Sequence, residues 1–214
     1  MKILAINGSP RKNSNTATLL KKALEGAAAQ GAETELIHLY DLNFKGCISC
    51  FACKLKDGKS YGKCAYQDGL TPVLEKIEEA DALILGSPIY LGNVTGEMRS
   101  FFERAIYPYA VYDENYTSLV KKKIPIGFIY TMNSDAKAKS TWNYVPILKS
   151  TEEFFARVFG SAEAMYATDT YQFDDYSKYV ATRFNEPQKA KHREDHFPID
   201  CQHAFDLGSK FANQ

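Results

Sequence analysis

The chain has 214 residues, and its 26 lysine and arginine residues balance 26 aspartate and glutamate residues, so the formal net charge is zero. Proteins that bind nucleic acid through its phosphates need a basic surface, and this balance argues against that class. Hydrophobic residues make up 45% of the chain and charged residues 24%, as in globular domains, and no segment approaches the roughly 18 apolar residues of a membrane span. This length predicts one domain, residues 1–214. The chain starts with a strand-like run and not an export signal, so we expect the protein in the cytoplasm.

Strand-like and helix-like patterns alternate along the chain. Strands are expected at Lys2–Ile6, Thr34–Tyr40, Ala82–Leu85, Ile124–Tyr130 and Ala162–Ala167. Amphipathic helices are expected from Thr16, from Thr71, from about Thr95, over Pro146–Phe159 and from Phe197. This alternation is typical of parallel crossover units.

Five strands alternating with helices predict an α/β fold, a flavodoxin-like doubly wound parallel sheet of order 2-1-3-4-5 with helices on both faces. We expect two additions to this fold, a cysteine-containing loop at about residues 45–69 and a C-terminal extension at about residues 168–214. In such sheets the ligand binds beyond the carboxyl ends of strands 1 and 3. The loops after these strands are therefore the expected site.

The loop after the first strand is rich in small, hydroxyl and amide side chains and leads into a helix; it reads Gly8-Ser9-Pro10-Arg11-Lys12-Asn13-Ser14-Asn15-Thr16. Such a loop can bind a phosphate dianion through N–H groups, hydroxyls and the positive end of the helix. It has neither a Walker A triplet nor the Gly-x-Gly-x-x-Gly spacing of dinucleotide folds. Helix capping alone is the alternative, but several polar residues at this position favour a phosphate site.

The loop after the third strand contains Pro88, which fixes the chain direction, and Gly92, which permits close approach of the backbone to a ligand. Backbone N–H groups placed at the edge of a flavin ring would stabilise the negative charge that develops there on reduction. A plain turn between strand and helix is the alternative for this loop taken alone.

Taken together, GSPRKNSNT (residues 8–16) and GSPIYLGNVTG (residues 86–96) resemble the NAD(P)H-dependent FMN reductases and iron–sulfur flavoproteins of the flavodoxin-like superfamily, over about residues 1–135. By this resemblance the FMN phosphate loop contains Ser9, Arg11, Ser14, Asn15 and Thr16, and the isoalloxazine loop contains Pro88, Ile89, Tyr90, Leu91, Gly92 and Asn93. Thr131, after the fourth strand, is a looser match. The resemblance implies an FMN-dependent oxidoreductase that accepts hydride from NAD(P)H and passes electrons to a small-molecule or protein acceptor. No catalytic side chain is assigned.

Four cysteines lie close together in the sequence: Cys47, Cys50 and Cys53 form a Cys-x2-Cys-x2-Cys run, and Cys64 follows across the segment Lys54–Lys63. Compact runs of this kind hold iron–sulfur clusters, and the resemblance implies a possible [4Fe–4S] cluster, although the fourth cysteine comes later here than in cluster-bearing members. A zinc site and unligated or redox-active thiols are the alternatives. Because the run follows strand 2, we expect it at the sheet edge that carries the flavin loops.

The remaining features carry weaker predictions. Tyrosines between residues 107 and 116 are expected to cover an oligomer interface or the flavin mouth, in a homodimer or homotetramer. His192 and His196 are expected in a solvated turn, and Cys201 in the core. Two other functional classes stay open, a non-enzymatic flavodoxin-like or iron–sulfur electron carrier and a thiol or metal redox sensor. Zero net charge argues against a carrier with a strongly charged docking face.

Overall fold

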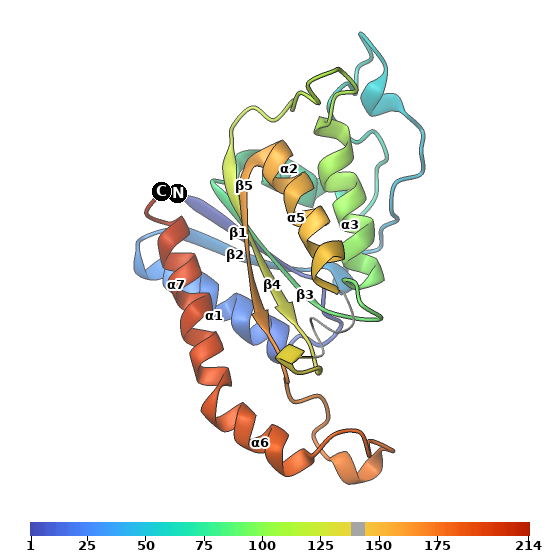
Figure 1. Cartoon of the computed structure of the whole chain (residues 1–214). Coiled ribbons are helices and arrows are strands. Elements are labelled where there is room, and N and C mark those ends of the chain that lie inside the picture. The colour runs from blue at the N-terminus through green and yellow to red at the C-terminus, as the bar shows by residue number, and fades with distance from the viewer. Residues whose placement is uncertain (138–143) are drawn as a thin grey trace.

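The computed structural model describes residues 1–137 and 144–214. Five parallel strands form one sheet of order β2-β1-β3-β4-β5 (Figure 1), as predicted. The strands are β1 (Lys2–Asn7), β2 (Glu33–His38), β3 (Ala82–Pro88), β4 (Ile124–Thr131) and β5 (Gly160–Ala167). The expected second strand ran to Tyr40, but the chain turns into a 3-10 helix at Leu39–Asp41.

The helices that accompany the sheet are α1 (Asn15–Ala29), α2 (Thr71–Glu79), α3 (Gly96–Ile106), α5 (Tyr144–Phe159), α6 (Glu186–Asp195) and α7 (Phe197–Phe211). The prediction of a solvated turn at His192 and His196 is confirmed for His196, which is exposed in the turn between α6 and α7. It is wrong for His192, which belongs to α6 and is partly buried. No helix within residues 1–137 or 144–214 combines the length and the apolar character needed to cross a bilayer.

Helices cover both faces of the sheet. Along β1, Ile3 and Ala5 point toward α1 and α7, whereas Leu4 and Ile6 point toward α2, α3 and α5. Successive side chains of a strand point to opposite faces, so an apolar run such as this one is buried on both sides. The core therefore lies in two layers, one on each side of the sheet.

The helices α1 and α7 cross at Gly26 and Gly208. A Cβ atom on Gly208 would lie 1.7 Å from the carbonyl oxygen of Ala23, and one on Gly26 would lie 2.0 Å from that of Phe205. No side chain fits at either position, so the two helix backbones touch. This contact attaches the C-terminal helix directly to the helix that follows β1.

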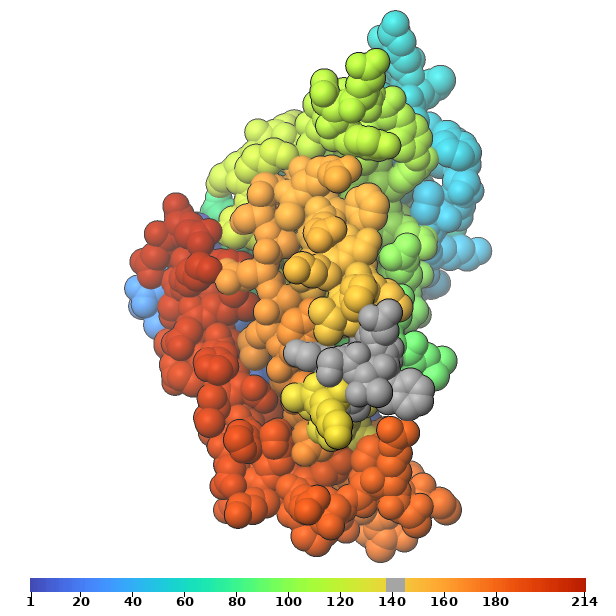
Figure 2. Space-filling view, viewed as in Figure 1, coloured from blue at the N-terminus to red at the C-terminus, as the bar shows by residue number. Residues whose placement is uncertain are grey.

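The additions to the sheet lie at opposite ends of the molecule. Figure 2 shows the C-terminal segment, in orange, at the end toward which the strands β4 and β5 point in Figure 1. The cysteine-containing loop, in cyan, extends at the other end. The carboxyl edge of the sheet is thus covered by the C-terminal segment.

Candidate functional site

A cavity of about 770 Å³ lies at the carboxyl edge of the sheet. Its lining comes from the loops after four strands: Ser9, Arg11, Ser14, Asn15 and Thr16 after β1, Pro88, Ile89, Tyr90, Leu91 and Gly92 at and after β3, Thr131, Met132, Asn133 and Ser134 at and after β4, and Thr170, Tyr171, Gln172 and Phe184 after β5. Eleven of the twelve predicted cofactor-binding residues are in this lining, and Asn93 is not. Small-molecule and cofactor sites typically occupy about 300–1,000 Å³, so the cavity has a suitable size.

The N-terminus of α1 opens into this cavity without a competing anion. Ser14 is the N-cap residue, but its side chain makes no capping hydrogen bond, and the first turn contains no acidic residue. The hydroxyl of Ser9 accepts a hydrogen bond of 3.1 Å from the N–H of Arg11, which folds the loop back on itself. Free N–H groups at a helix N-terminus attract anions, so this loop fits a phosphate.

Two of the predicted phosphate-loop residues connect the loop to its surroundings. The amide of Asn15 donates a hydrogen bond of 2.9 Å to the carbonyl oxygen of Tyr171. The hydroxyl of Thr16 lies 2.7 Å from the hydroxyl of Thr131, and both residues are buried. These side chains therefore position the loop against the segments that follow β4 and β5.

A partly buried pair at the strand ends supports the same loop, and sequence analysis missed it. Asn7, at the end of β1, accepts a hydrogen bond of 2.9 Å from the N–H of Ser9 and donates one of 2.8 Å to Nδ1 of His38. Burial lowers the pKa of His38, which favours the neutral ring that can accept this bond at Nδ1. His38 was predicted only as a strand residue, and Asn7 lay just beyond the expected first strand, so neither was assigned to the site.

The loop after β3 is a tight turn at the cavity rim. Tyr90 and Asn93 exchange both backbone hydrogen bonds, of 2.7 and 3.1 Å, and Leu91 and Gly92 between them have positive φ angles of 52° and 81°. This geometry strains Leu91, because only glycine adopts it freely. Asn93 closes the turn and does not line the cavity, and its side chain accepts a hydrogen bond of 2.8 Å from the N–H of Val94.

Thr95, the N-cap of α3, joins the two predicted ligand loops. Its hydroxyl donates a hydrogen bond of 2.7 Å to the carbonyl oxygen of Gly8, and its N–H donates one of 3.1 Å to the hydroxyl of Ser87. One residue therefore fixes the separation of the loops after β1 and β3. The sequence predicted a helix from about Thr95, but neither the cap nor the contacts across the sheet.

The segment after β5 forms a further wall of the cavity that sequence analysis did not assign. The carbonyl oxygen of Gln172 accepts a hydrogen bond of 2.6 Å from Arg11, and its side chain accepts one of 2.8 Å from the amide of Asn133. Gln172 thus connects the phosphate loop with the loop after β4. The strand order was a usable signal, because the loop after the fifth strand also begins at the carboxyl edge.

The four clustered cysteines border one small cavity of about 20 Å³, but they do not lie at the carboxyl edge of the sheet. The N–H of Cys47 donates a hydrogen bond of 3.1 Å to Glu103, and Cys64 accepts one of 3.3 Å from Arg104, so the loop lies against the C-terminal half of α3. At 1.5 Å per residue, that position is roughly 14 Å along α3 from Thr95. The prediction that the cysteines share the edge of the flavin loops is wrong.

Arg104 explains this placement. Its side chain is 1% exposed and donates hydrogen bonds to Asp68 (2.6 Å), to the carbonyl oxygens of Tyr66 (2.6 Å) and Lys45 (3.1 Å), and to Cys64. Burial raises the pKa of the Asp68 carboxyl, but the hydrogen bond from Arg104 and two backbone N–H groups more than offset it, and the net pKa is lowered. A buried guanidinium therefore attaches both ends of the cysteine loop to α3.

The arrangement of the thiols does not form a ready metal site. Cys47 and Cys50 are exposed, Cys64 is partly buried and Cys53 is buried. Across the residues that the structure describes, no three His, Cys, Asp or Glu side chains are grouped closely enough to hold a metal ion. Four thiols suit an iron–sulfur cluster chemically, and all four border the same small cavity, but they would have to come closer together to hold one.

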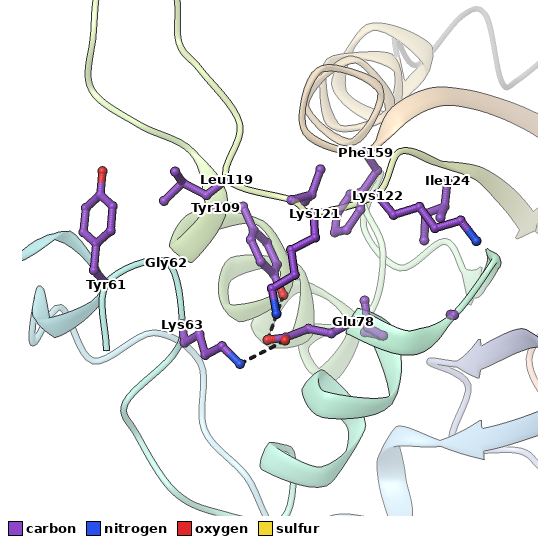
Figure 3. Close-up of a pocket in the computed structure, with 13 residues that line it drawn as sticks. Tyr61, Gly62, Lys63, Glu78, Tyr109, Leu119, Lys121, Lys122, Ile124 and Phe159 are labelled. Atoms are coloured by element: carbon purple, nitrogen blue, oxygen red, sulfur yellow. Dashed lines mark hydrogen bonds and ion pairs between the residues drawn. The ribbon is translucent and has the colours of Figure 1, made fainter. Parts of the chain in front are cut away.

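A second cavity, of about 240 Å³, lies at the amino edge of the sheet, beside the start of β4 (Figure 3). Phe159 and Ile124 provide apolar surface, and Glu78 pairs there with Lys63 at 2.9 Å. Tyr109 also contacts Glu78, and burial raises the pKa of this tyrosine. None of the predicted cofactor-binding or cysteine residues lines this cavity.

Comparison with known proteins shows the family of the chain. The profile of the NADPH-dependent FMN reductase family matches residues 1–164. The chain belongs to this family. An iron–sulfur flavoprotein of Archaeoglobus fulgidus is 47% identical over 105 residues, which are 49% of this chain and 49% of that protein. One of Methanocaldococcus jannaschii is 41% identical over 105 residues, 49% of this chain and 52% of that protein.

These alignments cover about half the length of the curated relatives. The whole fold is similar to that of an NAD(P)H:quinone oxidoreductase from Methanothermobacter marburgensis, with a TM-score of 0.70, 16% identity and 98% of each chain covered. At this identity the likeness concerns the fold. The family profile ends before α6 and α7, so the C-terminal segment lies outside the family match.

Proposed function

We propose that this chain is an FMN-dependent oxidoreductase that accepts hydride from NAD(P)H and passes electrons to a small-molecule or protein acceptor. The observation that carries the proposal is the joint placement of a phosphate-binding loop and the turn after β3 around one cavity of about 770 Å³. FMN, when bound, supplies the hydride acceptance and the electron release. Membership in the NADPH-dependent FMN reductase family supports this assignment.

The chain itself would bind and orient. Ser9, Ser14 and the N–H groups at the start of α1 would hold the phosphate, helped by the absence of a carboxylate in that turn. The turn Tyr90–Asn93 would place backbone groups at the flavin ring. The cavity also has a wall from Thr170–Gln172, which would limit access of water and acceptor to the ring.

Two anaerobic measurements test the proposal. FMN should bind more tightly than riboflavin, because riboflavin lacks the phosphate that the α1 N-terminus would hold. When the FMN-loaded protein is mixed with NADPH or NADH in a stopped-flow instrument, the visible absorbance of the flavin should decrease on the time scale of one catalytic turnover. Equal affinity for both flavins would contradict the phosphate assignment. Slow or absent reduction by both nucleotides would instead support a flavodoxin-like carrier.

A second function, electron relay through an iron–sulfur cluster, is favoured by the convergence of Cys47, Cys50, Cys53 and Cys64 on one cavity. Two matched relatives bear the name iron–sulfur flavoprotein, which supports this candidate. Ser49 and Phe51, on either side of Cys50, have positive φ angles of 54° and 56°. Such conformations turn backbone N–H groups toward anions and occur at many iron–sulfur sites.

Reconstitution with iron and sulfide without oxygen tests the relay. About four irons per chain, lost together in Cys47→Ser, Cys50→Ser and Cys53→Ser, would support it, and Cys64→Ser would show whether the fourth thiol closes the site. Fewer than about one iron per chain, with all four thiols still titratable, would contradict it. Stoichiometric zinc would instead indicate the metal-site alternative, and reversible loss of titratable thiols on oxidation would indicate a redox sensor.

We further propose that the chain acts as a homodimer or homotetramer. Tyr112 and Tyr116, in the segment between α3 and β4, are 69% and 57% exposed, and exposed aromatic groups are typical of contact surfaces. Light scattering over a range of concentrations tests this. A monomer with full reductase activity at every concentration would contradict it.

A further inference from the structure

The helix α6 has almost no apolar surface with which to pack. Its sequence is Glu-Pro-Gln-Lys-Ala-Lys-His-Arg-Glu-Asp, and its one buried residue is Lys189. A helix that is polar on all sides is not held by the burial of an apolar face. Polar contacts must therefore hold α6 in place, and most of them reach the segments after β1, β4 and β5, which form walls of the cavity at the carboxyl edge.

Lys189 joins two of those walls. Its side chain is 4% exposed, and its ammonium group donates hydrogen bonds of 2.6 Å to Asp169 and 2.8 Å to the carbonyl oxygen of Asn133. Asp169 follows β5 and Asn133 follows β4, so one buried cation connects the segments after two neighbouring strands. The ring of Phe184, which lines the cavity, lies 5.0 Å from the same ammonium group.

The next turn of α6 reaches the phosphate loop after β1. His192 and Arg193 follow Lys189 at helical spacing, so the three side chains share one face of the helix. His192 contacts the carbonyl oxygen of Thr168 at 3.1 Å, and Arg193 donates a hydrogen bond to the side-chain oxygen of Asn15 in the phosphate loop. Arg193 also lies on the ring of Phe197, 3.9 Å from its centre, which restricts the guanidinium.

We propose that Lys189 and Arg193 are positioning residues of the flavin site: Lys189 sets the separation of the segments after β4 and β5, and Arg193 sets the orientation of Asn15 at the start of α1. The proposal rests on the proposed binding of FMN. The two residues act on different parts of the ligand. Arg193 acts on the phosphate loop, whereas Lys189 acts on walls that both FMN and riboflavin would contact.

The test is a titration of folded variants with FMN and with riboflavin. Lys189→Met should weaken the binding of both flavins by about tenfold, whereas Arg193→Met should weaken FMN by about tenfold and riboflavin less than about twofold. Arg193→Lys, which can still donate to Asn15, should recover most of the FMN affinity. Lys191→Met is the matched control, because Lys191 is exposed on the same helix, and it should leave both affinities unchanged.

Loss of stability must be separated from loss of positioning. Lys189→Met leaves Asp169 without its buried partner, so a second variant, Lys189→Met with Asp169→Asn, removes both charges. We expect this double variant to regain most of the thermal stability but to keep the weakened affinity for both flavins and an altered visible circular dichroism of bound FMN. Recovery of wild-type affinity together with stability would overturn the positioning role.

The result for the wild-type protein separates this proposal from the proposed function. If the wild-type chain binds no flavin, both the proposed function and the positioning roles are contradicted. If the wild type binds FMN and the folded Lys189 and Arg193 variants bind it equally well, only the positioning roles are contradicted. The same loss of affinity in Lys191→Met would also contradict them.

Discussion

The hydroxyl oxygens of Thr16 and Thr131 lie 2.7 Å apart in a site where both side chains are buried. Thr16 is in the first turn of α1 and Thr131 ends β4, so one hydrogen bond joins the helix of the phosphate loop to an inner strand of the sheet. A buried hydrogen bond of this kind contributes about 1 kcal/mol, but leaving one partner unpaired costs about 1–3 kcal/mol.

The Thr131→Val variant should therefore be less stable than the wild type by about 1–3 kcal/mol, because the hydroxyl of Thr16 loses its buried partner. The double variant Thr16→Val with Thr131→Val removes both hydroxyls and should regain most of that free energy. Urea unfolding of the apoprotein measures both effects. If the losses of unfolding free energy in the single variants Thr16→Val and Thr131→Val simply add up in the double variant, the hydrogen bond is not the cause of the loss.

Substitution of Ser14 should change the preference between flavins and leave the fold intact. Its side chain makes no capping bond, so Ser14→Ala costs the helix little, but it removes a hydroxyl donor for the phosphate. We expect the ratio of riboflavin to FMN dissociation constants to fall about tenfold, equivalent to about 1.4 kcal/mol. Ser150→Ala, at an exposed position of α5, is the control. Equal losses for both flavins would argue against a phosphate contact.

The pairing of Asn7 with His38 should make the phosphate loop sensitive to pH. Burial lowers the pKa of His38 below the value of about 6.5 expected in the unfolded chain. The unfolded chain therefore binds the proton more readily, and stability should decrease as the pH falls below about 6.5 toward the lowered pKa. His38→Gln keeps an acceptor for Asn7 but does not titrate. Unfolding curves and FMN titrations between pH 5 and 8, compared between His38→Gln and the wild type, should show a smaller pH dependence in the variant.

Removal of the Arg104 side chain should release the cysteine loop. Arg104→Met leaves Asp68 and the carbonyl oxygens of Lys45 and Tyr66 without their partner, and breaking a buried pair in this way costs about 3–5 kcal/mol. Cys64 should then react faster with a thiol reagent. Arg99→Met, on an exposed turn of the same helix, should change neither stability nor thiol reactivity much. Unchanged thiol kinetics in a folded Arg104→Met protein would show that other contacts hold the loop.

The sheet could be predicted because its strands are short apolar runs between turn residues, and because alternation with helices leaves few topologies. The helix α6 could not be predicted from periodicity, since it has no apolar stripe. Its start was nevertheless present in the sequence, because the side chain of Asn185 caps the helix through the N–H of Gln188, and Pro187 lies in the first turn. Capping residues were thus the available signal where hydrophobic periodicity was missing.

The site was predictable to the extent that it depends on chain order. Loops that follow parallel strands meet at one edge, which brought most of the expected residues around one cavity. The cysteine loop was misplaced because its position depends on Arg104, a contact between segments far apart in the sequence. Strand order gives the starting point of a long loop, but tertiary contacts decide where the loop continues.

The crossing of α1 and α7 also limits how this sequence can evolve. Because a Cβ atom at Gly26 or Gly208 would collide with a backbone carbonyl oxygen of the other helix, neither position accepts a gradual increase in side-chain size. Relatives that keep this helix pair should therefore retain both glycines. A relative with a larger residue at either position must move the two helices apart, and it should show compensating changes where α6, which leads directly into α7, meets the cavity loops.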